Sequence, residues 1–283
     1  MRSEKDMYDL IIGFANDNPI IRAVGMEGSR VNPKAPRDDF QDYDISYFVT
    51  DMKPFVEDES WLDFLGERII MQKPEAMSLF PPSLGGWFSY LMIFTDGVRV
   101  DLKIIPIEDS EKYTESEKGM IKILLDKDSL FPQLPPPTDK IYHIIKPSDQ
   151  YYKDSCNEFW WVSTYVAKGL KRGEILYAID HLNNYVRPEL LRMLSWKIGI
   201  EQDFSVSLGK NNKYMEKYMA SDEWKLLLST YTLDTYGNCW FSLFRQIDLF
   251  RKTAKWVSEN LGYIYDEKMD KNVSKYLRKI HEM

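Results

Sequence analysis

Apolar and polar positions alternate along several short runs in the first half of the chain, whereas the second half repeats apolar residues every three or four positions. The first pattern is typical of strands and the second of amphipathic helices. One early segment also follows the helical period, with Ser3 placed to cap it. We expect helices or helical turns at residues 3–17, 58–66, 148–172, 174–197, 212–219, 221–230, 239–260 and 268–281, and strands at residues 20–27, 44–50, 68–71, 87–94 and 98–105.

A dense run of prolines separates the two patterns. Five of the 14 prolines lie in residues 131–147, and prolines so close together favour an extended connection over a helix or a central strand. We therefore expect an α+β domain at residues 1–135 and an all-helical bundle domain at residues 148–283.

Composition excludes several classes of protein. The chain has 283 residues, a net charge of −7 and a pI near 5.2, which argues against a duplex nucleic-acid binder because such proteins carry a basic face. The acidity agrees with a cationic small partner, although mild acidity also serves solubility alone. Cys156 and Cys239 have no metal-type spacing. Without a signal peptide or a membrane-length apolar run, the chain is expected to be cytoplasmic, with no membrane partner.

Three aspartates are candidates for a metal site. Asp42 and Asp44 stand two positions apart at the start of an expected strand, so their side chains share a face. In the second arm of the hairpin, Asp101 lies on the polar face, opposite the apolar positions of the same strand. Carboxylates that converge repel one another unless a cation neutralises them, and hard oxygen ligands suit Mg²⁺. The three residues together therefore predict a magnesium site.

A glycine-serine turn is the second element of this chemistry. Gly28-Ser29 follows the first expected strand, where backbone N–H groups and a hydroxyl can approach phosphate oxygens. Arg30 begins the following loop and either meets phosphate or is simply solvated. Each element alone has an ordinary explanation, because Gly-Ser pairs are common in turns and aspartates often cap helices. Their conjunction favours a nucleotide site with bound metal.

These residues carry a resemblance to a known superfamily. Gly28-Ser29 followed by Asp42-x-Asp44, with Asp101 on a later strand, resembles the DNA polymerase beta-like nucleotidyltransferases. Longer blocks resemble the aminoglycoside 6-adenylyltransferases, also called streptomycin adenylyltransferases, over nearly the whole chain. These blocks are residues 26–30, 40–50, 87–90, 124–128, 156–160, 165–170 and 178–183.

The resemblance implies a fold and a reaction. The fold is a nucleotidyltransferase domain, with a mixed β-sheet flanked by helices, followed by a helical domain. The reaction is Mg²⁺-dependent transfer of AMP from ATP to the 6-hydroxyl of streptomycin, which releases pyrophosphate and inactivates the antibiotic. Asp42, Asp44 and Asp101 would be catalytic and bind metal, while Gly28 and Ser29 would hold phosphates. The proton acceptor stays open between Asp101 and a base from the second domain.

One helix of the second half has a mixed stripe. Lys168 and Glu158 lie on it, roughly 15 Å apart at 1.5 Å per residue. We expect Lys168 to bind the triphosphate, as the resemblance also implies, and Glu158 to meet a guanidinium or ammonium group of the acceptor. The alternative is an ordinary amphipathic helix with paired surface charges, and for Glu158 both interpretations stay open. The stripe consists of Asp154, Glu158, Trp161, Tyr165, Lys168 and Arg172.

Two further residues are candidates for acceptor binding. Asp180 on the next helix would supply a second carboxylate, which suits streptomycin because a carboxylate pairs with a guanidinium in bidentate fashion; otherwise it is a surface residue. Trp87 would stack on a ligand, although large aromatics are more often core. Rival functions are a nucleotidyltransferase of the same fold with another small-molecule or protein hydroxyl as acceptor, and a catalytically silent nucleotide-binding module. Nothing in the sequence indicates an oligomeric state.

Overall fold

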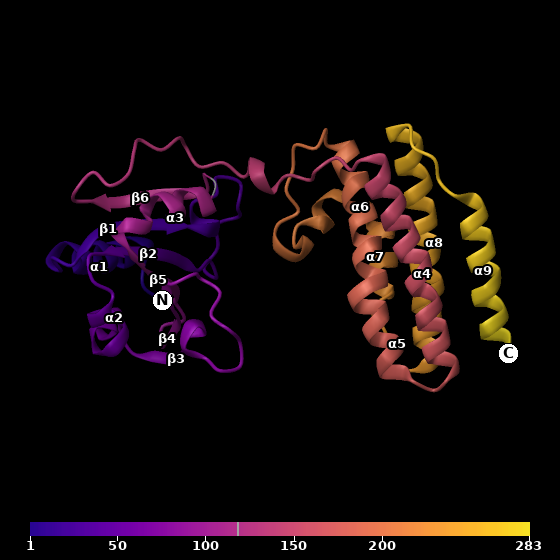
Figure 1. Cartoon of the computed structure of the whole chain (residues 1–283), viewed down its shortest axis with the longest axis horizontal. Helices are drawn as coiled ribbons and strands as arrows, with labels where there is room; N and C mark the ends of the chain where they lie inside the picture. The colour runs from indigo at the N-terminus through magenta and orange to yellow at the C-terminus, as the bar shows by residue number, and fades with distance from the viewer. Residues whose placement is uncertain (118) are drawn as a thin grey trace. The chain divides into compact units, whose positions relative to one another are not determined.

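The structure, a computed structural model, describes residues 1–117 and 119–283. The chain forms two compact units, Met1–Ile141 and Tyr142–Met283. The first unit combines a β-sheet with helices, and the elements of the second are helices and helical turns (Figure 1), so the predicted fold class is confirmed. The proline-rich residues 131–139 carry neither helix nor strand. The predicted domain limits, residues 1–135 and 148–283, stay a prediction.

A six-stranded mixed sheet forms the centre of the first unit, in the order β3-β4-β5-β2-β1-β6. β2 and β5 pair in parallel, and the other neighbouring pairs are antiparallel. The predicted hairpin is confirmed as β4 and β5, and its turn uses Gly97 at φ +85°, a conformation that glycine adopts without strain. The strands are β1 (Ile21–Glu27), β2 (Tyr43–Val49), β3 (Arg68–Gln72), β4 (Phe88–Phe94), β5 (Arg99–Pro106) and β6 (Ile121–Asp126).

Two hydrophobic clusters cover the two faces of the sheet. On one face Tyr47 packs in the larger cluster, and its hydroxyl donates to the carbonyl of Ile11, 2.9 Å away. On the other face Phe48 packs edge-on against Tyr113, with ring centroids 5.0 Å apart. Successive residues of β2 thus enter opposite clusters, as alternation requires. The helices of this unit are α1 (Glu4–Asp17), α2 (Lys53–Glu57) and α3 (Ser110–Glu117).

Local signals account for some of these elements better than for others. Ser3 caps α1 in a capping box with Asp6, as the sequence predicts. The helix expected at residues 58–66 is a 3₁₀-helix, Ser60–Leu65. The pattern of apolar and polar positions in the sequence did not indicate α2, α3 or β6. In α3 Tyr113 is the buried residue, so its sequence shows no apolar period.

The second unit is built from longer helices. α4 begins after Ser148, whose hydroxyl accepts from the backbone N–H of Tyr151, and Gly173 follows its end at φ +76°, as predicted. Among the described residues, no helix combines the length and the apolar character that a membrane span needs. The helices are α4 (Asp149–Lys171), α5 (Ile175–His181), α6 (Arg187–Glu201), α7 (Ser221–Ser229), α8 (Tyr236–Leu261) and α9 (Glu267–Glu282).

The helix expected at residues 174–197 is interrupted. A π-helical turn, Leu182–Val186, separates α5 from α6 just before Pro188. Proline lacks an N–H and its ring displaces the carbonyl four residues earlier, so a local widening of the helix accommodates it. The predicted kink is therefore a π turn.

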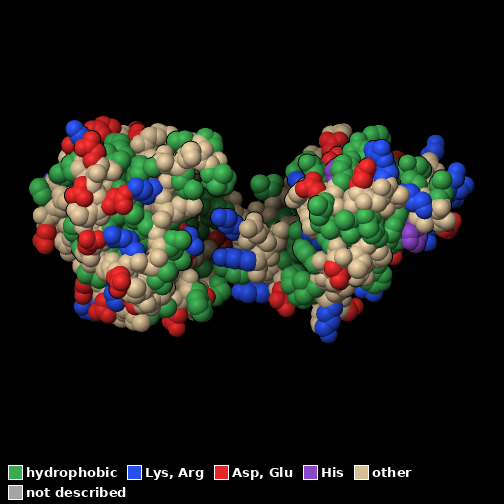
Figure 2. Space-filling view, turned by 90° about the horizontal axis from the view of Figure 1, so that it is seen from below, with side chains coloured by type: hydrophobic (Ala, Val, Ile, Leu, Met, Phe, Trp, Pro, Cys, Tyr) green, Lys and Arg blue, Asp and Glu red, His purple; other side chains and the backbone are tan. Residues whose placement is uncertain are grey.

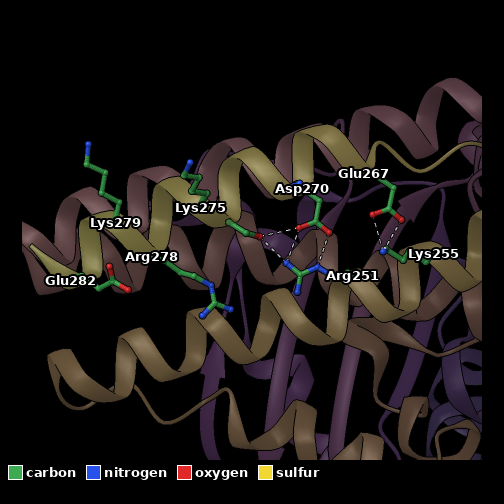
Figure 3. A pocket seen from close by; sticks show the side chains of 10 residues that line it. Arg251, Lys255, Glu267, Asp270, Lys275, Arg278, Lys279 and Glu282 are labelled. Carbon is green, nitrogen blue, oxygen red and sulfur yellow. Dashed lines mark hydrogen bonds and ion pairs between the residues drawn. The ribbon is translucent and has the colours of Figure 1, made fainter.

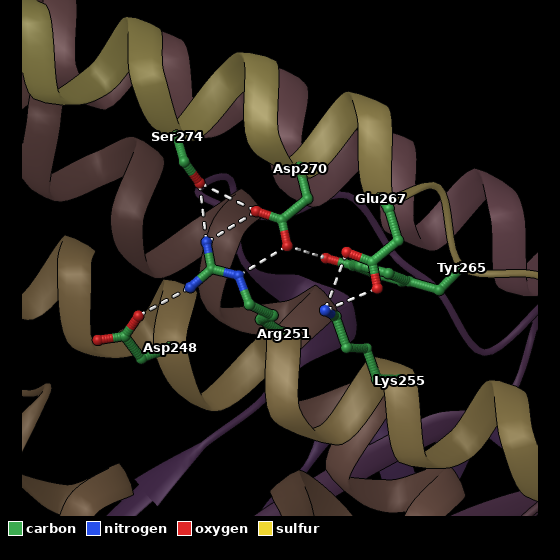
Figure 4. Close-up of polar contacts among 7 residues, drawn as sticks. All are labelled: Asp248, Arg251, Lys255, Tyr265, Glu267, Asp270 and Ser274. Atoms are coloured by element: carbon green, nitrogen blue, oxygen red, sulfur yellow. Dashed lines mark hydrogen bonds and ion pairs between the residues drawn. The ribbon is translucent and has the colours of Figure 1, made fainter.

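A buried ion pair ties α9 to α8 in this unit. Arg251 donates to both carboxylate oxygens of Asp270, at 2.6 and 2.7 Å, and Tyr265 donates to the same carboxylate at 2.8 Å (Figure 4). Burial raises the pKa of Asp270, but the hydrogen bonds from Arg251, Tyr265 and Ser274, together with the charge of Arg251, lower it by more. Arg251 and Asp270 also line a hollow of about 760 Å³ (Figure 3). Because Asp270 already has these partners, we interpret the network as a structural tie.

Charges of both signs are interspersed over the molecular face seen in Figure 2, within each unit. Hydrophobic side chains lie scattered between them. A mixed surface of this kind is ordinary for a protein with a modest net charge.

Asp96 in the hairpin turn provides a test of how the N-terminus is held. Its carboxylate accepts from the backbone N–H and the Nε of Arg2, at 3.0 and 2.8 Å, and these contacts lower its pKa to about 2. Asp96→Asn should lower the free energy of unfolding at pH 7 by about 1 kcal/mol, because the side chain is partly exposed and screened. Since the folded pKa lies below the ordinary 3.8, the difference should shrink as pH falls from about 4 towards 2.

Urea unfolding at pH 7, 4 and 3 measures this dependence. Asp9→Asn is the matched control, because Asp9 pairs with Lys5 on an exposed face of α1, and it should change stability little at each pH. An Asp96→Asn effect that grew towards pH 3 would contradict the assignment.

Candidate active site

Strand pairing places three carboxylates in a row across the centre of the sheet. Asp44 on β2 pairs with Asp101 on β5 and with Glu27 on β1. Residues directly opposite on neighbouring strands point to the same face, so Asp101 leaves the sheet beside Asp44, as its alternation predicted. Asp42 precedes β2 by one residue and shares the parity of Asp44. The row lies on the face covered by the smaller hydrophobic cluster, to which Phe48 belongs.

The row concentrates negative charge around Asp44. Burial, together with the negative charges of Glu27, Asp101 and Asp42, raises the pKa of Asp44 to about 7. Lys103 opposes it. The ionised form of Asp44 is thus disfavoured unless additional positive charge arrives.

Glu27, the member of the row on β1, forms a buried network with Lys103. Glu27 is 4% exposed, and its carboxylate lies 2.5 Å from Lys103 Nζ. It also accepts from the hydroxyls of Tyr113, at 2.5 Å, and Ser46, at 3.2 Å. Burial lowers the pKa of Lys103, but the charges of Glu27 and Glu117 raise it by more, so the ammonium form is favoured. Nothing in the sequence pattern indicated this network, although Lys103 shares the polar face of β5 with Asp101.

Gly28 brings the backbone directly against the carboxylate row. It has φ +75° and begins a 3₁₀ turn, Gly28–Arg30, immediately after β1. A Cβ at this position would lie 2.1 Å from Oδ2 of Asp44. Glycine is therefore required both by conformation and by space. The Gly-Ser turn lies beside the aspartates, where its predicted phosphate role needs it.

Arg30 binds the backbone of the segment that precedes β2. Its Nε and Nη2 donate to the backbone carbonyls of Asp42 and Gln41, at 3.0 and 2.8 Å, and its guanidinium lies 3.7 Å from the ring centroid of Tyr43. The side chain is 10% exposed. These contacts hold the segment that presents Asp42, and nucleotide binding by Arg30 stays a prediction.

The donor chemistry of the row fits a hard cation, but the carboxylates are not gathered into a ready cage. Asp42, Asp44 and Asp101 offer only oxygen donors, which suit Mg²⁺. In the described part of the chain, no three His, Cys, Asp or Glu residues are already arranged to hold a metal ion. A cation of the chain itself is present instead, because Arg99 lies 2.9 Å from Asp101 and 3.6 Å from Asp42.

The mixed stripe of α4 is exposed except at Tyr165, which is partly buried against the hydrophobic core of the unit. Trp161 is 59% exposed, and its indole N–H donates to the hydroxyl of Tyr165 at 2.9 Å. Lys168 lies 5.1 Å from the Tyr165 ring centroid, and both Lys168 and Glu158 are exposed. An aromatic residue in an ordinary amphipathic helix would face the core, so the exposure of Trp161 favours the binding interpretation of the stripe. Asp180 on α5 is also exposed and accepts from Asn184 at 2.6 Å.

Trp87 is placed differently from the other candidates. It is 6% exposed in the smaller hydrophobic cluster, and its indole N–H donates to Asp109 at 2.6 Å. Lys112 lies over its ring, 5.0 Å from the centroid. The ring is therefore packed inside the first unit, which favours the core interpretation, and acceptor binding by Trp87 stays a prediction.

Known proteins resemble this chain along its whole length. A family model for streptomycin adenylyltransferase matches residues 1–280. The chain belongs to the streptomycin adenylyltransferase family. The aminoglycoside 6-adenylyltransferase of Bacillus subtilis (strain 168) is 51% identical over 281 residues, which cover 99% of each chain. That of Campylobacter jejuni is 50% identical over 282 residues, which cover 99% of this chain and 97% of the relative.

A solved structure agrees with these relatives. A crystal structure of an aminoglycoside 6-adenyltransferase from Bacillus subtilis is 47% identical and has a TM-score of 0.50, with 99% of both chains covered. Membership in the streptomycin adenylyltransferase family makes the chain an enzyme, a nucleotidyltransferase, and confirms the resemblance seen in the sequence. The roles of individual site residues stay predictions.

Gly28→Ala tests the close approach of the turn to Asp44. The new Cβ would displace the carboxylate, so the rate of nucleotide transfer should fall by about 100-fold or more. The positive φ should lower the free energy of unfolding by about 1–2 kcal/mol. Gly13→Ala is the matched control, because Gly13 lies in α1 and a Cβ added there would have nothing within 4 Å. It should keep the rate and raise stability by about 0.5–1 kcal/mol. A Gly28→Ala enzyme with the wild-type rate would show that the carboxylate position does not matter.

Proposed function

We propose that this enzyme transfers AMP from ATP to a hydroxyl of streptomycin, at the 6-position, and releases pyrophosphate. The observation that carries the proposal is the carboxylate row, in which Asp44 and Asp101 pair across β2 and β5 beside the Gly28-Ser29 turn. The names of the relatives, aminoglycoside 6-adenylyltransferases, support the acceptor and the position. The added nucleotide would inactivate the antibiotic by bringing bulk and negative charge to a cation.

Each part of the reaction has a proposed residue. Asp42, Asp44 and Asp101 would hold Mg²⁺, which when bound offsets the negative charge that develops on the phosphates. Gly28 and Ser29 would hold the outer phosphates. The carboxylates also orient the acceptor hydroxyl for attack on the α-phosphorus, in line with the departing pyrophosphate.

The second unit would supply contacts to both substrates. Lys168 is proposed to bind the triphosphate, and Glu158 and Asp180 to pair with guanidinium groups of the acceptor. Their exposure supports this role, since a ligand can reach them. The exposed ring of Trp161 adds a face on which a cationic group can rest.

Label transfer tests the function directly. The protein is incubated with Mg²⁺, ATP labelled at the α-phosphate, and a panel of aminoglycosides that includes streptomycin. Labelled streptomycin and an equal amount of pyrophosphate are expected, and Asp44→Asn should lower the rate by about 100-fold or more without unfolding the protein. Asp9→Asn, a surface change in α1, is the control and should keep the rate. Label on another acceptor would replace the proposed substrate, and no label with any acceptor would favour a silent binding module.

The proposed role of Lys168 is tested by measuring the KM for ATP separately from the KM for streptomycin. Lys168→Ala should raise the KM for ATP by about tenfold, because one charge-assisted contact to phosphate is lost, and leave the KM for streptomycin nearly unchanged. Lys153→Ala on the same helix is the control, since Lys153 pairs with Asp149 in the first turn of α4. Initial rates at varied ATP measure the effect. An unchanged KM for ATP would reject the assignment.

A further inference from the structure

Arg99 occupies both oxygens of one catalytic carboxylate. Its Nε donates to Oδ1 of Asp101 at 3.0 Å and its Nη2 donates to Oδ2 at 2.9 Å. The Nε also lies 3.6 Å from Oδ2 of Asp42. One guanidinium therefore joins two of the three candidate aspartates, in the volume where the proposed divalent ion would bind.

The guanidinium and a divalent ion compete for the same oxygens. Mg²⁺ binds carboxylate oxygens at about 2.0–2.1 Å in near-octahedral geometry and keeps several waters. A positive guanidinium paired in fork fashion with Asp101 repels such an ion and occupies one lone pair on each carboxylate oxygen.

Arg99 is held loosely compared with the other cation of β5. Its side chain is 43% exposed, and the ion pairs described for it go to Asp101 and Asp42. Lys103, two residues beyond Asp101 on the same face, is 24% exposed and is paired with Glu27 and Glu117. An exposed pair is worth little and is easily exchanged, whereas breaking a buried pair leaves an uncompensated charge. Arg99 can therefore leave the row while Lys103 stays.

We propose that Arg99 is a displaceable counterion, which neutralises Asp42 and Asp101 while no divalent ion is bound and must swing away for the ion to enter. The inference rests on the proposed metal-dependent transfer. Arg99 acts by neutralising the mutually repelling carboxylates and by competing with the ion that replaces it. Removal of Arg99 should therefore strengthen the binding of a divalent ion by the nucleotide-free protein.

Titration of the full-length protein with Mn²⁺ tests this, with free Mn²⁺ measured by its paramagnetic resonance signal. Arg99→Met should bind Mn²⁺ about fivefold more tightly than the wild type, the change expected when an exposed ion pair no longer competes. Arg99→Lys keeps the charge but loses the bidentate geometry, so its affinity for Mn²⁺ should lie between those of Arg99→Met and the wild type. Asp101→Asn, measured in parallel, reports Mn²⁺ bound elsewhere on the protein.

Arg22→Met is the matched control. Arg22 forms a bidentate pair with Asp128 in the same unit, at 2.5 and 2.6 Å, with its side chain 26% exposed, and its loss should leave Mn²⁺ binding unchanged. Circular dichroism confirms folding, and Arg99→Gln replaces Arg99→Met if the latter does not fold. Unchanged or weaker Mn²⁺ binding by the Arg99 variant overturns the proposal. If the wild type still transfers AMP in that case, the proposed function stands. If the wild type neither binds Mn²⁺ nor transfers AMP, both fail.

Discussion

The parallel pairing of β2 with β5 is the constraint on which the site depends. It sets Asp44 opposite Asp101, and the antiparallel pairing of β1 with β2 sets Glu27 on the other side of Asp44. A shift of one residue in either pairing would send one of these carboxylates into the opposite hydrophobic cluster. The apolar residues that alternate with them, such as Ile45 and Leu102, fix this register through their burial. The core of the first unit thus determines where the charges gather.

Concentrated negative charge then governs the surroundings of the row. Lys103 neutralises Glu27 from inside the fold, with Tyr113 and Ser46 completing the hydrogen bonds of that carboxylate. Space for this arrangement comes from a glycine: a Cβ at Gly25 would lie 2.7 Å from the Tyr113 hydroxyl. The phenol therefore rests directly on β1. Such a fully partnered buried network holds its members in one geometry, which gives the neighbouring aspartates a rigid base.

Much of this arrangement was predictable from local patterns, and the remainder depends on tertiary contacts. The hairpin through Gly97, the cap at Ser148 and the shared face of Asp44 and Asp101 follow from turn chemistry and periodicity. The burial of Glu27 does not follow from local patterns, because a glutamate at the end of an apolar strand can equally well be exposed to solvent. The exposure of Trp161 could not be predicted either, since only the packing of α4 decides which stripe of the helix faces solvent.

The two cations of β5 show why residue type alone does not determine a role. Arg99 and Lys103 lie on the same face of one strand, on either side of Asp101 along the chain. Lys103 is closed in by α3 through Glu117 and Tyr113, so its charge is a fixed part of the fold. Arg99 lies at the first residue of the strand, where the sheet ends and solvent begins. A fixed cation can neutralise a fixed anion. A site that exchanges ions during turnover instead needs a neutralising side chain that can move away. In the proposed exchange, the exposed end of β5 would let Arg99 leave, so its position along the strand, more than its chemistry, makes it suitable.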